Sequence, residues 1–138
     1  MLFADIIGQE HLKKHLTHSV DNGRIPHAQL FVGSEGSGAL PMAIAYAQYV
    51  LCSNHSGENN TGDSACNLKL SNLSHPDLHF AFPVATNHTV KKHPVSNLFL
   101  EDWRKLLKEQ PYCNLFDWYK QLGIDNKSQI FGTFYLTS

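Results

Sequence analysis

The residues Gly33-Ser34-Glu35-Gly36-Ser37-Gly38-Ala39-Leu40 decide how the rest of this sequence is interpreted. They follow an apolar run at residues 28–32 and precede residues 41–51, whose composition is typical of a buried helix. An apolar strand, a glycine loop and a helix, in this order, are the setting that a phosphate-binding loop requires. Glycines permit the tight turn that points successive backbone N–H groups at an anion.

The loop lacks the two residues that give a phosphate-binding loop its chemistry. Its glycines, Gly33, Gly36 and Gly38, include the spacing G-x-x-x-x-G, but Ala39 stands where the lysine belongs and Leu40 where the hydroxyl residue belongs. Without the lysine no positive charge reaches the outer phosphates, and without the hydroxyl a magnesium ion loses its protein ligand. The sequence therefore predicts the shape of a P-loop without its chemistry. A glycine-rich turn with no ligand is the alternative.

Length and composition exclude several classes of protein. The chain has 138 residues, is 42% hydrophobic, and carries 11 basic and 12 acidic residues. These values argue for a folded domain and neither demand nor exclude a nucleic-acid partner. No apolar run approaches the roughly 20 residues of a membrane span, and no signal peptide is evident, so the cytoplasm is expected. Three cysteines do not indicate a disulfide framework.

Apolar periodicity predicts the secondary structure. Helices are expected over residues 9–22, from residues 38–40 onward, within residues 67–74, from Ser96 or Asn97 to Pro111, and from Leu115 to Gly123. Strands are expected at residues 28–32 and 77–84, and the apolar residues 129–138 form a further strand candidate without a partner. Trp103 and Trp118 recur among leucines at helical spacing, which favours a core or subunit interface over base stacking.

Four segments carry a resemblance to a known family. They are residues 3–9 (FADIIGQ), 24–33 (RIPHAQLFVG), 36–38 (GSG) and 75–80 (HPDLHF). Together they resemble the N-terminal part of a clamp-loader AAA+ ATPase domain, over residues 2–128. Within that family the chain is most similar to the delta-prime subunits of bacterial DNA polymerase III, in the form found in Bacteroidetes-type bacteria.

The resemblance implies a role in DNA replication. The intact complex opens the ring-shaped sliding clamp and places it on primed DNA, and delta-prime subunits work in it beside gamma/tau and delta subunits without hydrolysing ATP. Ala39 and Leu40 agree with that role. By the same resemblance, the glycine loop corresponds to the nucleotide loop and residues 5–9 to the segment flanking the adenine pocket. No cofactor is expected. The alternative is an ATP-hydrolysing P-loop motor of the gamma/tau type, or another P-loop nucleotide hydrolase.

The resemblance also points to a zinc module that has degenerated. Many relatives carry four zinc-binding cysteines just after the P-loop helix, whereas residues 52–74 here retain only Cys52 and Cys66. A replacement set of Cys52, His55, Cys66 and His75 can be written, but its spacings are wide for a tetrahedral site. A degenerate module without zinc is favoured.

The C-terminal part of the chain departs from the family. We find no Walker B strand, sensor strand, lid or arginine motif, and Glu101 and Asp102 belong to a helix start rather than to a Walker B strand. The expected fold is an incomplete α/β P-loop (AAA+) module over residues 1–128, a parallel sheet with flanking helices whose C-terminal strands are missing. A divergent tail follows at residues 129–138. Such a fragment exposes strand edges and is expected to be marginally stable.

Overall fold

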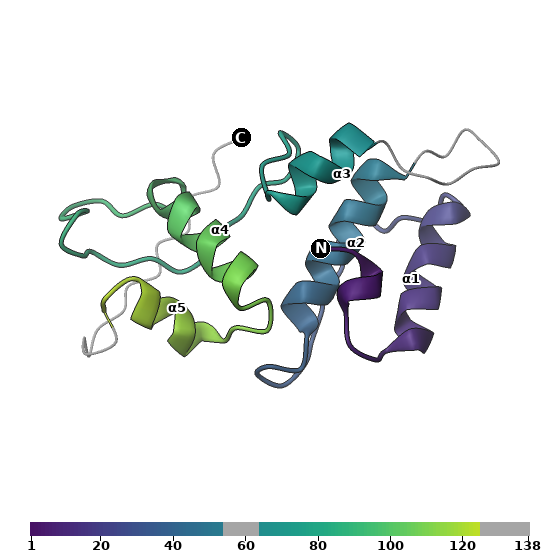
Figure 1. Cartoon of the computed structure of the whole chain (residues 1–138), viewed down its shortest axis with the longest axis horizontal. Helices are drawn as coiled ribbons and strands as arrows, with labels where there is room; N and C mark the ends of the chain where they lie inside the picture. The colour runs from purple at the N-terminus through teal and green to yellow at the C-terminus, as the bar shows by residue number, and fades with distance from the viewer. Residues whose placement is uncertain (54–63, 125–138) are drawn as a thin grey trace. The chain divides into compact units, whose positions relative to one another are not determined.

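The computed structural model describes residues 1–53 and 64–124, and these residues form helices joined by loops (Figure 1). The elements are η1 (Phe3–Asp5), α1 (Glu10–Asp21), α2 (Ala39–Cys52), α3 (Ser64–Ser71), η2 (Ser96–Phe99), α4 (Leu100–Glu109) and α5 (Leu115–Gln121). Each predicted helix is confirmed, with α3 beginning earlier and ending earlier than expected. Among the described residues, no helix is both long enough and apolar enough to cross a bilayer.

The two expected strand segments have no regular secondary structure in the described part of the chain. Residues 28–32 and 77–84 are both described, and neither forms a strand there. Leu30 and Val32 leave 87% and 82% of their surface exposed. An exposed apolar run is what an incomplete sheet would leave at this position. The parallel sheet stays a prediction, and the expected tail strand lies outside the described residues.

The chain divides into two compact units, one spanning Met1–Leu78 and a second beginning at His79. This division differs from the predicted boundary at residue 128, which falls outside the described residues and stays a prediction.

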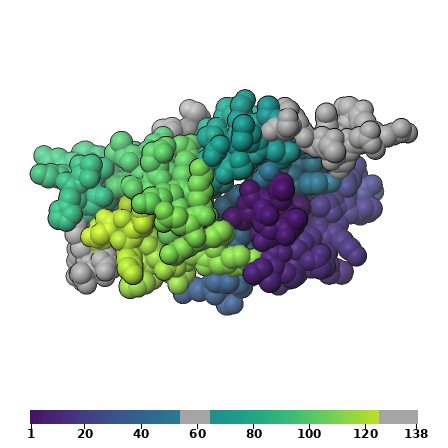
Figure 2. All heavy atoms as spheres, viewed as in Figure 1, coloured from purple at the N-terminus to yellow at the C-terminus, as the bar shows by residue number. Residues whose placement is uncertain are grey.

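Helix α2 is the centre of the first unit and contacts η1, α1 and α3. The core on its α1 side consists of Ile6, Leu16, Val20, Met42, Ala45 and Tyr46. Figure 2 shows the first residues, in purple, lying against this part of the molecule. The Tyr49 hydroxyl donates a hydrogen bond of 2.8 Å to the Asp21 carboxylate, which fastens α2 to the end of α1. The apolar character of α2 on most sides explains why it is the buried helix.

An aromatic cluster forms the core of the second unit. Phe82 stacks on Trp103 with ring centroids 4.5 Å apart, and Trp118 meets both rings edge-on at 5.0 Å. The Trp118 indole also donates to the Pro83 carbonyl at 2.7 Å. The prediction that both tryptophans belong to a core or interface is confirmed for the core, since both are buried.

The helical region begins at Ser96, where the sequence predicts, as the short helix η2 that leads into α4. Ser96 and Asn97 both lie within η2. The residue in the capping position is Val95, whose side chain makes no capping hydrogen bond. The Ser96 hydroxyl instead donates to the Phe82 carbonyl at 3.0 Å and accepts from the Phe82 N–H at 3.2 Å. It therefore satisfies the backbone of an apolar segment that has no strand partner in the described residues. Glu101 and Asp102 lie in the first turn of α4, which confirms their predicted place at a helix start.

Candidate functional site

The glycine loop makes a tight turn directly before α2, and its identity as a P-loop stays a prediction. Gly36 and Gly38 have φ angles of 71° and 96°, in the left-handed region that residues with a side chain avoid. The Ser37 N–H donates to the Ser34 carbonyl at 3.0 Å and closes a turn. Gly38 precedes α2, and its carbonyl accepts the first helical hydrogen bond, from Met42, at 3.0 Å. The loop therefore ends directly at the N-terminus of α2.

Gly33 lies against the Ser37 side chain at the start of the loop. A Cβ atom at this position would lie 2.3 Å from the Ser37 hydroxyl oxygen and 3.5 Å from the Ala39 Cβ. The first distance is far below van der Waals contact, so a side chain at residue 33 would displace Ser37.

A cleft of about 670 Å³ lies beside the loop. Its walls come from α1, from the extended segment before the loop and from the start of α2. The lining residues are Gln9, Leu12, Leu16, Gln29, Leu30, Phe31, Val32, Gly33, Ser34, Ser37, Gly38, Ala39 and Met42. The volume is in the range of small-molecule sites, roughly 300–1,000 Å³. Gln9 is the member of the predicted adenine-flanking segment that lines the cleft.

The lining of the cleft is electrically neutral. All of its residues are described, and none carries an ionisable side chain. Ala39 contributes a methyl group to the lining, and Leu40 lies outside it. Glu35 is exposed on the loop and lies outside the lining. Pro41, in the first turn of α2, has no N–H to offer an anion. A triphosphate here would meet backbone N–H groups and neutral polar side chains such as those of Ser34 and Ser37, with no cationic side chain in the lining.

The structure brings together only part of the zinc set. Cys52 and Cys66 are bonded to each other, and the His75 Nδ1 atom accepts a 3.2 Å hydrogen bond from the Asp77 N–H. Within residues 1–53 and 64–124, no three metal-binding side chains are grouped to hold an ion. His55 lies outside the described residues, so the absence of zinc stays a prediction.

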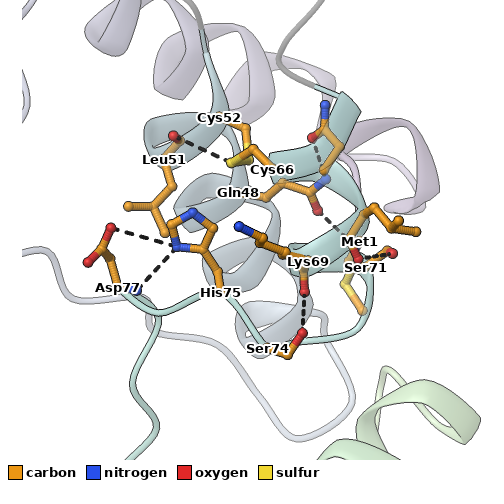
Figure 3. Close-up of a disulfide and its surroundings, with 12 residues drawn as sticks. Met1, Gln48, Leu51, Cys52, Cys66, Lys69, Ser71, Ser74, His75 and Asp77 are labelled. Carbon is orange, nitrogen blue, oxygen red and sulfur yellow. Dashed lines mark hydrogen bonds and ion pairs between the residues drawn. A yellow bond between two sulfur atoms is a disulfide. The ribbon is translucent and has the colours of Figure 1, made fainter.

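A disulfide joins Cys52 to Cys66, so the expectation that the cysteines do not pair is wrong for these two (Figure 3). Helix α3 packs against the end of α2, which brings the two Cα atoms to 5.6 Å. This separation is within the usual range for a disulfide, about 4.4–6.8 Å. Nothing in the residue spacing indicates the pairing, because it depends on how two helices pack.

Gln48 is a second residue that the sequence does not single out. It leaves only 3% of its surface exposed, and it sits in a helix of otherwise apolar character. Its Oε1 atom accepts a hydrogen bond from the Met1 amino group at 2.9 Å, and its amide donates to Asn67 Oδ1 at 2.8 Å (Figure 3). Gln48 thus connects the N-terminal residues, α2 and α3. A lone polar residue in an apolar helix is the only signal that could have found it.

Comparison with known proteins identifies the family. The family model described as "DNA polymerase III, delta subunit" matches residues 8–112, which is more than half of the chain. The chain belongs to this family. The predicted DNA polymerase III clamp-loader family is therefore confirmed, while the delta-prime type and the Bacteroidetes form stay predictions.

The chain is also similar to curated proteins that are subunits of DNA polymerase III. The DNA polymerase III subunit gamma/tau of Mycobacterium tuberculosis (strain ATCC 25618 / H37Rv) is 42% identical over 50 residues, covering 36% of this chain and 9% of the relative. Subunit tau of Bacillus subtilis (strain 168) is 35% identical over 65 residues, which cover 47% of this chain and 11% of the relative. Subunit gamma/tau of Mycoplasma pneumoniae is 29% identical over 70 residues, which cover 51% of this chain and 10% of the relative. The chain thus spans about a tenth of the length of these relatives. No solved structure matches it significantly.

Proposed function

We propose that this chain is a clamp-loader subunit of the delta-prime type, which does not hydrolyse ATP. It acts in DNA replication in the cytoplasm, as a fixed member of an assembly with gamma/tau and delta subunits that loads the sliding clamp onto primed DNA. Its fold in that assembly is the AAA+ type, with residues 28–32 as a strand of a parallel sheet. Family membership supports the assembly, and Ala39 at the edge of the cleft supports the lack of hydrolysis.

The position of Ala39 carries the proposal because phosphoryl transfer depends on positive charge. Enzymes that transfer the γ-phosphoryl group work mainly by positioning and by electrostatic stabilisation, with a P-loop lysine and a magnesium ion held by the adjacent hydroxyl. Here the first position has a methyl group in the cleft and the second has Leu40, outside it. No residue of the lining supplies positive charge in their place. The loop retains a phosphate-binding shape with neither source of catalysis.

A second candidate is an ATP-hydrolysing subunit of the gamma/tau type. It is favoured by the relatives, which are named as gamma and tau subunits. In that case the cleft beside the glycine loop would hold ATP and magnesium. The two candidates differ in one measurable property, which is magnesium-dependent turnover.

The test is phosphate release from ATP by the full chain, with magnesium and with a chelator. We expect equal rates in the two conditions, because the chain offers neither lysine nor hydroxyl at the loop. The control is the pair of substitutions Gly36→Val and Gly38→Val, which destroys the left-handed backbone of the loop. Magnesium-dependent release by the natural chain that this control abolishes would contradict the proposal and establish the second candidate. Magnesium-dependent release that persists in the control does not come from the glycine loop, so it would not contradict the proposal.

A further inference from the structure

We propose that Cys52 and Cys66 form a reversible redox cross-link that sets how firmly α3 is fastened to the C-terminal end of α2. This device goes beyond the proposed function and does not depend on it. Cys52 is the last residue of α2, and Cys66 lies in the first turn of α3. The two ends of the bond therefore belong to different helices, and breaking it changes how those helices are held.

The surroundings of the pair are suited to both redox states. Cys52 and Cys66 leave 6% and 8% of their surface exposed and share an apolar cluster with Leu70, against which Leu51 and Leu78 pack. A thiol behaves as a small apolar side chain, so the reduced pair fits the same cluster. In the reduced state the Cys66 thiol has an acceptor, the Leu51 carbonyl, 3.7 Å from its sulfur (Figure 3).

The contact between α2 and α3 does not rest on the disulfide alone. Leu70 is fully buried, and the Gln48 amide donates to Asn67 across the same two helices at 2.8 Å. These interactions hold the two sulfur atoms near each other after the bond is broken, so it can form again. The bond closes a stretch with a sequence separation of 14 residues, which restricts the chain when α3 detaches. Oxidation is therefore expected to make detachment of α3 rarer.

The third cysteine, Cys113, is poorly suited to compete for the disulfide between Cys52 and Cys66. Cys113 is free and half-buried in the second unit. Burial raises the pKa of its thiol, and the nearby Asp117 carboxylate raises it further. A thiol with a raised pKa is mostly protonated at neutral pH, and the protonated form does not attack disulfides. Cys113 thus provides a matched control within the same chain.

The chemistry is thiol–disulfide exchange with a small-molecule disulfide such as oxidised glutathione. One protein thiolate attacks a glutathione sulfur, which forms a mixed disulfide and releases one glutathione thiolate. The second protein thiolate then attacks the protein sulfur of that mixed disulfide and releases the other glutathione. The protein pair loses two electrons and two protons, and one oxidised glutathione becomes two reduced molecules. Reduced glutathione in excess drives the same steps backwards.

The test equilibrates the full chain in buffers of defined oxidised and reduced glutathione, with and without concentrated urea. Free thiols are then alkylated, and the pairing is mapped by mass spectrometry. We expect a single Cys52–Cys66 bond, a free Cys113, and an equilibrium constant for bond formation at least about tenfold larger without urea. Dithiothreitol without denaturant should restore both thiols. Cleavage by protease within α3 should be slower in the oxidised chain.

Several results would overturn the proposal. They are an equal equilibrium constant with and without urea, pairing through Cys113, thiols that stay reduced at every buffer composition, or a bond that dithiothreitol breaks only in denaturant. The central readout uses the natural sequence, so it does not depend on whether a variant folds. Cys113→Ser should behave like the natural chain, and Cys52→Ser should lose the transition; the reverse pattern would also contradict the proposal.

Discussion

Replacing Trp118 by alanine is expected to lower the free energy of unfolding of the second unit by about 3–5 kcal/mol. Trp118 leaves only 1% of its surface exposed, and its ring meets both Phe82 and Trp103 edge-on at 5.0 Å. The Trp118→Ala variant would leave a cavity between these rings and remove the donor for the Pro83 carbonyl. Loss of the packed aromatic cluster is the largest single effect that we expect in this unit.

The measurement is urea unfolding of the full chain followed by tryptophan fluorescence. The chain has two tryptophans, both in the second unit, so Trp103 remains as the reporter in the Trp118→Ala variant. Phe116→Ala is the matched control, because Phe116 is an aromatic residue of the same helix with 60% of its surface exposed. We expect a change within about 0.5 kcal/mol for this control. Equal effects of the two substitutions would show that the cluster does not form the core.

Replacing Leu70 by alanine is expected to destabilise the first unit by about 2–5 kcal/mol. Leu70 is fully buried where α3 meets the end of α2, beside Cys52 and Cys66. Truncating it to alanine removes the apolar contact that holds α3 in place when the cysteines are reduced.

This second prediction is measured by circular dichroism during urea unfolding, in reducing buffer so that the disulfide does not contribute. Leu68→Ala is the control, since Leu68 belongs to the same helix and has 65% of its surface exposed. Only the Leu70→Ala variant should unfold at markedly lower urea. If the Leu68→Ala variant were equally destabilised, α3 would have to pack through a different face.

Local patterns in the sequence were sufficient to place the helices and a tight glycine turn before α2. The i, i+4 spacing of Leu12, Leu16 and Val20 specifies one face of α1, and Leu16 and Val20 are buried as that face requires. Gly36 and Gly38 adopt left-handed conformations, which suit the tight turn that the sequence predicts. These features depend on neighbours within a few residues, so a single sequence contains the information.

Features that depend on packing between distant segments were not predicted. The Cys52–Cys66 bond and the hydrogen bond from Gln48 to Asn67 exist because α3 lies on α2, and no local pattern specifies that contact. Serine and asparagine favour helix caps, so Ser96 or Asn97 could have capped the helix that starts there, yet the Ser96 hydroxyl binds the Phe82 backbone 14 residues away. The tertiary fold places the Phe82 backbone beside Ser96, and the Ser96 hydroxyl satisfies its N–H and carbonyl groups.

The central claim is that the glycine loop has kept a phosphate-binding shape after losing the charge that makes it function. Titration calorimetry of the full chain with ATP and magnesium tests this claim most directly, with the paired Gly36→Val and Gly38→Val substitutions as the control. We predict no binding tighter than about 1 mM for either protein. Micromolar binding of ATP to the natural chain, absent from the control, would contradict the claim.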